Sequence, residues 1–306
     1  MSASSPSNFW MKNKTETLLF MVVHPVTVPF LKCSLDSLSR QDEPDFDLLL
    51  LLDEVHVPDV EGILAQVKPL NVTMQTESAS IAGNRKFGID FATRLGYQHL
   101  VFCDGDDTFA SNRVRISKQI LKEKNVDFVV NDLNIVDSEG KILCENYYEN
   151  RLEDGFLLPS DFLLERNICG LSNTAVRVSS LRDIFIPDHL VAVDWYLFSV
   201  LLLKGCSGCF TAETITYYRQ HSANCLGIGK VSESKVGEMM RMKRDHLEAL
   251  AGESEVYASL FRRFTAVGNK FENEAFQMRL RKVVTDHSEK FPFWWESLIT
   301  STLENV

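Results

Sequence analysis

The sequence has little that would take the chain into a membrane or onto nucleic acid. Its longest purely aliphatic run, residues 48–52, is far shorter than the roughly 20 residues that a bilayer-spanning helix needs. Basic residues are in the minority, because 32 Lys and Arg stand against 42 Asp and Glu, a formal net charge of -10 at pH 7. This balance disfavours a general role on nucleic acid or on an anionic membrane surface. We expect a soluble protein that touches a membrane peripherally at most.

Cysteine is scattered and odd in number. The seven cysteines include only one CxxC pair, Cys206 and Cys209, and no histidine stands near it at zinc-finger spacing. A chain of 306 residues can form its core without disulfides, so a reducing compartment is favoured. We expect small, buried or inert thiols at the pair, and a zinc site is the alternative.

The beginning of the chain lacks the basic start and the apolar run of a secretory signal. It is polar and Ser-rich, which predicts a flexible tail over residues 1–14. With the cysteine usage, this favours a cytoplasmic protein, peripheral at the inner face of the membrane if it meets one.

Apolar runs of strand length alternate with helical segments over the first 135 residues. This alternation predicts an α/β fold with a mostly parallel sheet flanked by helices. The predicted strands cover residues 17–23, 46–52, 71–77, 99–103 and 126–131. The predicted helices cover residues 29–38, 60–68, 83–95 and 113–124.

The pattern changes in the second half of the chain. Residues 134–148 form two apolar arms around Ser138-Glu139-Gly140, which predicts a hairpin. Helices and short strands mix over residues 152–218. Residues 231–251 and 256–290 are dense in Glu, Lys, Arg, Met and Phe without turn pairs, so we expect two or three helices there. The predicted division is an α/β domain at 15–228 and a C-terminal helical region at 229–306.

Acidic residues follow two of the predicted strands. Asp53 ends the second strand, and Asp104, Asp106 and Asp107 follow the fourth. Ligands of open parallel sheets bind at the carboxyl ends of the strands, so these side chains should converge. Crowded carboxylates repel one another unless a cation lies among them, and oxygen ligands beside a diphosphate suit Mg²⁺ or Mn²⁺. The alternative is a turn in which Asp107 or Thr108 caps the next helix.

Residues 84–107, NRKFGIDFATRLGYQHLVFCDGDD, resemble glycosyltransferase family 2. The resemblance lies in an Arg, a Gly, an Ala and an apolar strand that closes on Asp-x-Asp-Asp. Further matches are Val23-His24-Pro25, Asp53-Glu54, Asp194 in VAVDWYLFSVLLLKG, and YYRQHSAN at 217–224, so the likeness covers roughly residues 17–225. It implies a GT-A, Rossmann-like fold and an inverting, metal-dependent transfer of a sugar from a nucleotide-diphosphate donor, a UDP-sugar in our reading.

The resemblance also implies roles for individual residues. Asp53 resembles the acid that hydrogen-bonds the nucleobase, Arg85 the basic residue near the nucleotide, and Asp104 the acid that contacts the ribose or sugar. Asp106 resembles the metal ligand of the DxD motif, with Asp107 as a helper. The implied nucleotide-sugar site comprises His24, Pro25, Asp53, Arg85, Asp104 and Arg219. The implied site for Mn²⁺ or Mg²⁺ comprises Asp106, Asp104 and His221, and the alternative for His221 is an ordinary surface histidine.

Asp194 occupies the place of the family's general base, which takes a proton from the acceptor hydroxyl. The alternative is a helix N-cap ahead of residues 195–203. The loop of Gly170, Leu171 and Ser172 lies where the family places its acceptor loop. The aromatic residues of FPFWWESLI, 291–299, form either a membrane- or partner-facing patch or a helix packed onto the body.

The match has departures. Lys86 stands where the family usually has Asn, Val193 stands where an acid often precedes the base, and two extra residues separate Ala92 from Gly96. These departures concern the nucleotide and the base, and not the fold. The acceptor class implied is a glycan or a lipid-linked sugar. Two other functions compete: a nucleotidyltransferase, which normally has a Gly-rich basic loop after its first strand, and a non-catalytic binding subunit of the same fold.

Overall fold

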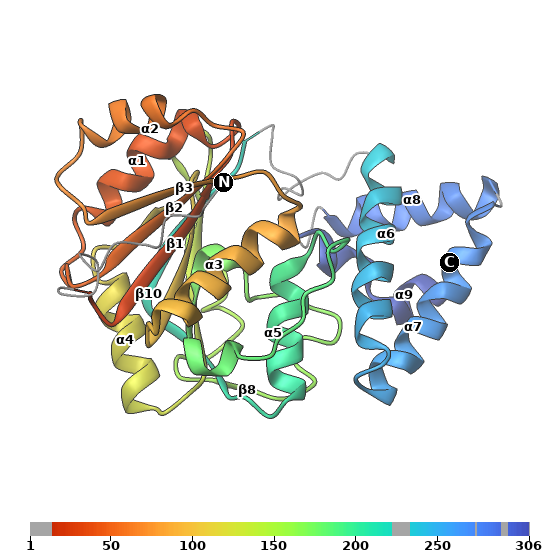
Figure 1. Ribbon diagram of the computed structural model, residues 1–306. Helices are drawn as coiled ribbons and strands as arrows, with labels where there is room; N and C mark the ends of the chain where they lie inside the picture. Colours follow the sequence, from red (N-terminus) through yellow and green to blue (C-terminus); the bar gives the residue numbers. More distant parts are fainter. Residues whose placement is uncertain (1–13, 222–232, 273, 289–292, 306) are drawn as a thin grey trace, which may run out of the picture.

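A single mixed sheet forms the body of the protein. The computed structural model describes residues 14–221, 233–272, 274–288 and 293–305 (Figure 1). The sheet order is β3-β2-β1-β4-β9-β6-β10-β5, with β7 beside β6 and β8 beside β10. The strands are β1 (Thr17–Val23), β2 (Asp47–Asp53), β3 (Val72–Glu77), β4 (His99–Asp104), β5 (Thr108–Phe109), β6 (Phe128–Val136), β7 (Ile142–Cys144), β8 (Leu157–Leu158), β9 (Thr174–Arg177) and β10 (Gly208–Arg219).

The long pairings of the sheet are parallel. They join β3 to β2, β2 to β1, β1 to β4 and β6 to β10. The short strand β9 lies between β4 and β6 and is antiparallel to both. This confirms the predicted mostly parallel sheet. The predicted hairpin is present as the antiparallel pair of β6 and β7.

The predicted end of one strand at residue 131 is wrong, because β6 continues to Val136 through buried polar residues. Asp132 is fully buried, and its carboxylate accepts backbone N–H groups of Leu133, Tyr148 and Glu149 at 2.7, 2.7 and 2.9 Å. Burial is tolerated where a polar group is hydrogen-bonded, so this acid does not end the strand.

Helices cover both faces of the sheet (Figure 1). Alternate residues of β1 separate the two layers: Met21 packs in the cluster that holds Leu31 and Leu35 of α1, whereas Phe20 packs with α3 and α5. The predicted helix at 60–68 is α2, which begins at Val57 and ends at Leu64. It begins earlier than predicted because Pro58 is favourable in the first turn of a helix. The helices of this part are α1 (Val28–Leu38), α2 (Val57–Leu64), α3 (Ile81–Leu95), α4 (Arg113–Glu123) and α5 (Val193–Leu203).

The C-terminal helices lie together beyond α5 and away from the long parallel strands (Figure 1). They are α6 (Glu233–Leu250), α7 (Glu255–Gly268), α8 (Glu274–Ser288) and α9 (Thr300–Glu304), which agrees with the predicted helical region. Their buried side chains, such as Leu247 and Leu260, belong to the same hydrophobic cluster as Phe20 of β1. The helical region therefore shares a continuous core with the sheet.

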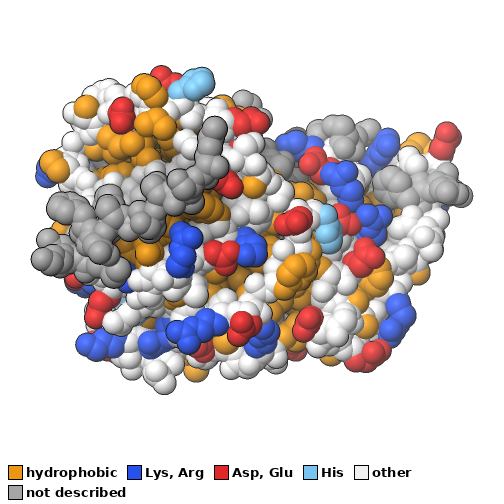
Figure 2. All heavy atoms as spheres, in the orientation of Figure 1, with side chains coloured by type: hydrophobic (Ala, Val, Ile, Leu, Met, Phe, Trp, Pro, Cys, Tyr) orange, Lys and Arg blue, Asp and Glu red, His pale blue; other side chains and the backbone are white. Residues whose placement is uncertain are grey.

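The terminal aromatic residues pack onto the body where the structure describes their side chains. Phe293 stacks on Tyr148 at a centroid distance of 6.1 Å, and Phe293 and Trp295 are 8% and 5% exposed. These two rings are not available to a membrane or a partner. Within the described residues, the length and hydropathy of the helices do not reach what a bilayer-spanning segment requires. Acidic and basic side chains are interspersed over much of the face shown in Figure 2.

The contact between α3 and β1 depends on a glycine. A Cβ on Gly88 would lie 2.2–2.5 Å from ring carbons of Phe20, whereas a Cβ on Gly62 of α2 would meet nothing within 4 Å.

We expect Gly88→Ala to destabilise the fold by about 1–3 kcal/mol through overpacking. Gly62→Ala, the matched control, should be neutral or stabilising by up to about 1 kcal/mol because it removes a helical glycine. Urea unfolding of both variants measures this, and equal stabilities would contradict the packing described.

The junction of α5 and α6 contains a buried histidine. His246 stacks on Trp195 at 4.1 Å, and both of its ring nitrogens lack hydrogen-bond partners in the described part of the chain. Burial, and then the nearby Lys243, lower the pKa of His246 well below its usual value. The folded protein therefore resists protonation of this ring.

The unfolded chain takes up a proton at His246 near pH 6.5 while the folded chain does not, so this group reduces stability as the pH falls below about 6.5. We expect His246→Phe to remove this contribution to the loss of stability at low pH. It should also raise the free energy of unfolding by about 1–3 kcal/mol, because an unpaired polar ring is removed from the core. The measurement is the unfolding free energy as a function of pH. The exposed His189, changed to Gln, is the control and should leave the curve as it is.

Candidate active site

The parallel register brings three predicted strand ends to one edge of the sheet. Val23 of β1 pairs with Leu52, and Val22 pairs with Asp104. His24, Asp53 and Asp104 are therefore neighbours at the carboxyl edge, as the order of strands predicts.

Two consecutive residues of α3 contact this edge. The Asn84 amide donates to Asp53 at 2.8 Å, and Arg85 forms an ion pair with Asp104 at 3.0 Å. Ser80 caps α3 by accepting the N–H of Gly83, which begins the helix early enough to place both side chains. Arg85 lies beside a predicted nucleotide-sugar acid, although it neutralises that acid here.

The DGDD segment is a turn followed by a short strand. The N–H of Asp107 donates to the carbonyl of Asp104 at 3.3 Å, β5 follows, and α4 begins at Arg113 behind the N-cap Asn112. The alternative in which Asp107 or Thr108 caps the next helix is therefore wrong. Asp107 is 1% exposed, and burial raises the pKa of its carboxyl well above the usual range. Of the two last acids in the turn, Asp106 is the one that reaches the surface.

Arg219 fastens this turn to the end of β10. Its N–H donates to the Asp107 carboxylate at 2.7 Å, and its Nε donates to the carbonyl of Asp106 at 2.7 Å. The same guanidinium donates to the carbonyls of Asp137 and Ser138 at 3.2 and 3.0 Å. Arg219 therefore holds two turns, at 104–107 and 137–140, in one position.

His221 lies against the acid predicted to bind metal. Its Nε2 is 3.0 Å from Oδ2 of Asp106, and its ring packs at a tilt against Phe30 of α1, with the ring centroids 4.7 Å apart. The alternative of an ordinary surface histidine does not describe this placement. The predicted segment continues through 222–224, which lie outside the described residues.

The turn after β1 touches the DGDD turn. The side chain of Thr27 closes the turn by bonding the N–H and carbonyl of His24 at 3.1 and 2.9 Å. A Cβ on Gly105 would lie 3.0 Å from the Thr27 hydroxyl, so glycine lets the two turns approach. His24 is half-buried and Pro25 is exposed beside this contact.

Asp194 is the second residue of α5, and its N-cap is Ala192, so the N-cap alternative is wrong. Its Oδ1 accepts the N–H of Trp195 at 2.8 Å, and its Oδ2 accepts the amide of Asn167 at 3.0 Å. Burial raises the pKa of Asp194, and the two hydrogen bonds oppose that rise. Asp104 raises and Arg85 lowers the same pKa, so Asp194 lies within electrostatic reach of the strand-end acids.

The predicted acceptor loop lies partly beneath these acids. Leu171 and Ser172 are buried, and the Ser172 hydroxyl accepts the N–H of Asp104 at 3.4 Å. Gly170 precedes the short 3-10 helix Leu171–Asn173 and is half-buried. Ser172 thus supports the floor of the site, and a contact of Gly170 with an acceptor stays a prediction.

Sequence reasoning missed three residues of the site. Asn84 and Asn167 hold carboxylates from helices and loops far away in the sequence. Burial raises the pKa of the Tyr218 hydroxyl well above its usual value, and so do Asp107, Asp106, Asp104 and Asp194. Tyr218 therefore keeps its proton. Its position next to Arg219 in YYRQH was the available signal.

The residues predicted to hold a metal do not form a three-ligand cluster. Among the described residues, no group of three or more His, Cys, Asp and Glu side chains is placed to bind an ion. Mg²⁺, however, is usually held by one or two carboxylates together with substrate phosphates. Asp104 and Asp106 supply two carboxylates and fit that donor set. Burial raises the pKa of the Cys206 and Cys209 thiols, which agrees with inert thiols in the CxxC pair.

Comparison with known proteins gives structural neighbours only. No protein-family model and no curated protein sequence matches the chain. Staphylococcus aureus TarS 1-349 in complex with UDP-GlcNAc is 14% identical with a TM-score of 0.58, and the match covers 94% of this chain and 90% of that one. Its complex with UDP is 17% identical with a TM-score of 0.57, over 84% and 75%.

A third neighbour is the mannosyltransferase PcManGT from Pyrobaculum calidifontis in complex with GDP-Man and Mn²⁺. It is 11% identical with a TM-score of 0.56, and the match covers 96% of this chain and 88% of that one. At identities this low, the structural similarity shows a shared fold and nothing more. The predicted GT-A fold class is therefore confirmed.

The role of Arg219 as a fastener of two turns can be tested without substrate. Arg219→Lys keeps the charge but loses the planar fork, so we expect a loss of about 1–3 kcal/mol in stability. Amide hydrogen exchange should rise more at 104–107 and 137–140 than in β2, whose exchange follows the global loss of stability alone. Arg182→Lys, at an exposed position, is the control. Unchanged exchange in both turns would show that Arg219 does not hold them.

Proposed function

We propose that the chain is a metal-assisted, inverting glycosyltransferase that moves a sugar from a nucleotide diphosphate to an acceptor hydroxyl on a glycan or glycolipid. The carrying observation is the common rim at which Asp53, Asp104 and Asp106 lie. Structural neighbours with UDP-GlcNAc, or with GDP-Man and Mn²⁺, support a nucleotide-sugar donor.

In this proposal, the end of β2 and the start of α3 bind the nucleoside. Asp53 accepts a hydrogen bond from the base, and Asn84 fixes the orientation of that carboxylate. Arg85 pairs with Asp104 before the nucleotide-sugar binds, and it turns toward a phosphate when the nucleotide-sugar enters. The turn at His24 and Pro25 forms the neighbouring wall. A UDP-sugar is the donor that we propose to test first.

The phosphate end of the donor lies at the DGDD turn in this proposal. Asp106 and Asp104, with His221, would hold Mn²⁺ or Mg²⁺, and Arg219 keeps the turn in place. A bound cation supplies Lewis-acid stabilisation of the charge that grows on the leaving diphosphate.

Asp194 acts as the general base. Its carboxylate takes the proton of the acceptor hydroxyl as the hydroxyl oxygen bonds to the anomeric carbon and the bond to the diphosphate breaks. One displacement from the opposite face inverts the configuration. We further propose a cytoplasmic protein with an α/β catalytic domain at 15–228 and a helical region at 229–306; the free cysteines support a reducing compartment.

Donor binding can be tested by thermal shift. UDP, GDP and CDP, each with and without Mn²⁺, are the probes, because a ligand that binds only the folded state stabilises it by about 2.7 kcal/mol at 100 times its dissociation constant. We expect one diphosphate to raise the melting temperature only with Mn²⁺. No shift with any diphosphate would count against the proposed donor class.

Measurement of turnover distinguishes the proposed metal ligand, Asp106, from the proposed base, Asp194. Asp106→Asn should abolish Mn²⁺-dependent transfer and the Mn²⁺-dependent thermal shift, since it removes the proposed metal ligand. Asp194→Asn should lower kcat by about 10²–10⁴-fold while the diphosphate still binds, since it removes the base alone. The exposed Asp188→Asn is the control. Turnover retained in Asp106→Asn would refute the metal assignment.

A further inference from the structure

The segment 163–169 runs beside the start of α5 and bonds to it twice. The indole N–H of Trp195 donates to the carbonyl of Leu163 at 2.6 Å, and the amide of Asn167 donates to Asp194 at 3.0 Å. The carbonyl oxygen of the Asn167 side chain accepts the N–H of Cys169 at 3.2 Å. Both ends of the Asn167 amide are therefore engaged, which fixes the direction of its N–H₂ group toward Asp194.

The two oxygens of Asp194 receive donors of different origin. Oδ1 is bonded to the backbone of its own helix, whereas Oδ2 depends on Asn167. A donated hydrogen bond favours the ionised carboxylate, and two donors in different directions fix the plane of the group. Each carboxylate oxygen has a further lone pair, so a hydroxyl can still approach.

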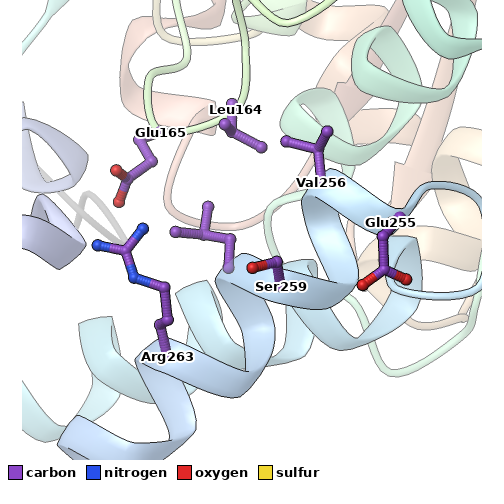
Figure 3. Close-up of a pocket in the computed structure, with 7 residues that line it drawn as sticks. Leu164, Glu165, Glu255, Val256, Ser259 and Arg263 are labelled. Atoms are coloured by element: carbon purple, nitrogen blue, oxygen red, sulfur yellow. The ribbon is translucent and has the colours of Figure 1, made fainter.

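The same segment is fastened to the C-terminal helices two residues before Asn167. Glu165 forms an ion pair of 2.7 Å with the fully buried Lys243 of α6 and accepts the N–H of Thr300 at 2.7 Å. Glu165 also lines a pocket of about 390 Å³ between this segment and α7. In Figure 3 the side chains of Glu165 and Arg263 point toward one another across it.

The buried charge of Lys243 is costly unless it is paired, and the half-buried Glu165 supplies that partner, so displacement of the segment would leave Lys243 unpaired. Asn167 is thus attached on one side to the acid and, through the chain at Glu165, to the helical region. The helical region and α5 belong to the same core cluster, so both anchors of Asn167 are joined through packed side chains.

We propose that Asn167 is a positioning residue for Asp194, and that the Glu165–Lys243 ion pair makes the C-terminal helices part of its support. This inference rests on the proposed function, in which Asp194 is the base. Loss of the Asn167 donor leaves the backbone at Trp195 as the remaining described donor to Asp194, so its ionised form is less favoured and its orientation is less fixed.

The test is the pH dependence of kcat in Asn167→Asp and Asn167→Ala. Both remove the amide donor, and Asn167→Asp keeps an acceptor for Cys169 N–H, so the turn can form. We expect the acid limb of kcat to move to higher pH, because a base with a raised pKa ionises later. We also expect kcat at pH 7 to fall at least about tenfold, with KM for the donor nearly unchanged. A structural defect alone would lower both without moving the limb.

The exposed Asn150, changed to Asp, controls for the added charge. Folding of every variant is checked by melting temperature and by the diphosphate-induced shift, and if Asn167→Asp does not fold, Asn167→Ala decides. Lys243→Met together with Glu165→Gln should give a smaller shift of the same sign.

The failures are distinguishable. If Asp194→Asn keeps turnover, the base assignment of the proposed function fails. If Asp194→Asn is inactive while both Asn167 variants keep the wild-type acid limb and kcat, the positioning role alone is overturned.

Discussion

The candidate site depends on the register in which β1 pairs in parallel with β2 on one side and β4 on the other. That register puts Asp53 and Asp104 at one edge, within reach of the two polar residues that α3 presents there. Gly88 lets α3 lie close enough to β1 for this contact. A shift of one residue in either pairing would turn the strand-end acids to the opposite face.

The site gathers negative charge and compensates for it by several means. Arg85 pairs with Asp104, His221 approaches Asp106, and Asp107 takes a backbone N–H from Arg219. Beneath the turn, the buried guanidinium of Arg113 donates to the carbonyl of Phe102 at 2.9 Å. Its positive charge also acts on Asp107 at close range. These contacts let the acids lie close together.

The C-terminal helices pack against α5, which bears Asp194, and contribute polar contacts to the segment beside it. Their buried side chains belong to the core that holds α3 and α5, and His246 stacks on the residue next to Asp194. The ion pair of Lys243 with Glu165 adds a polar connection to the segment that bears Asn167. The helical region and the acid of α5 are therefore joined by packing and by polar contacts, although they are distant in sequence.

The sequence by itself determined the alternation of strands and helices and the placement of Asp53 and Asp104–Asp107 at strand ends, because strand-length apolar runs and their polar stops are local signals. It did not reveal that β6 runs through Asp132, since the N–H groups that satisfy this acid come from 148 and 149. Tertiary structure alone decided that Asn84 and Asn167 join the acids. Their partners lie far along the chain, and the sequence around an asparagine does not indicate which carboxylate its amide will contact.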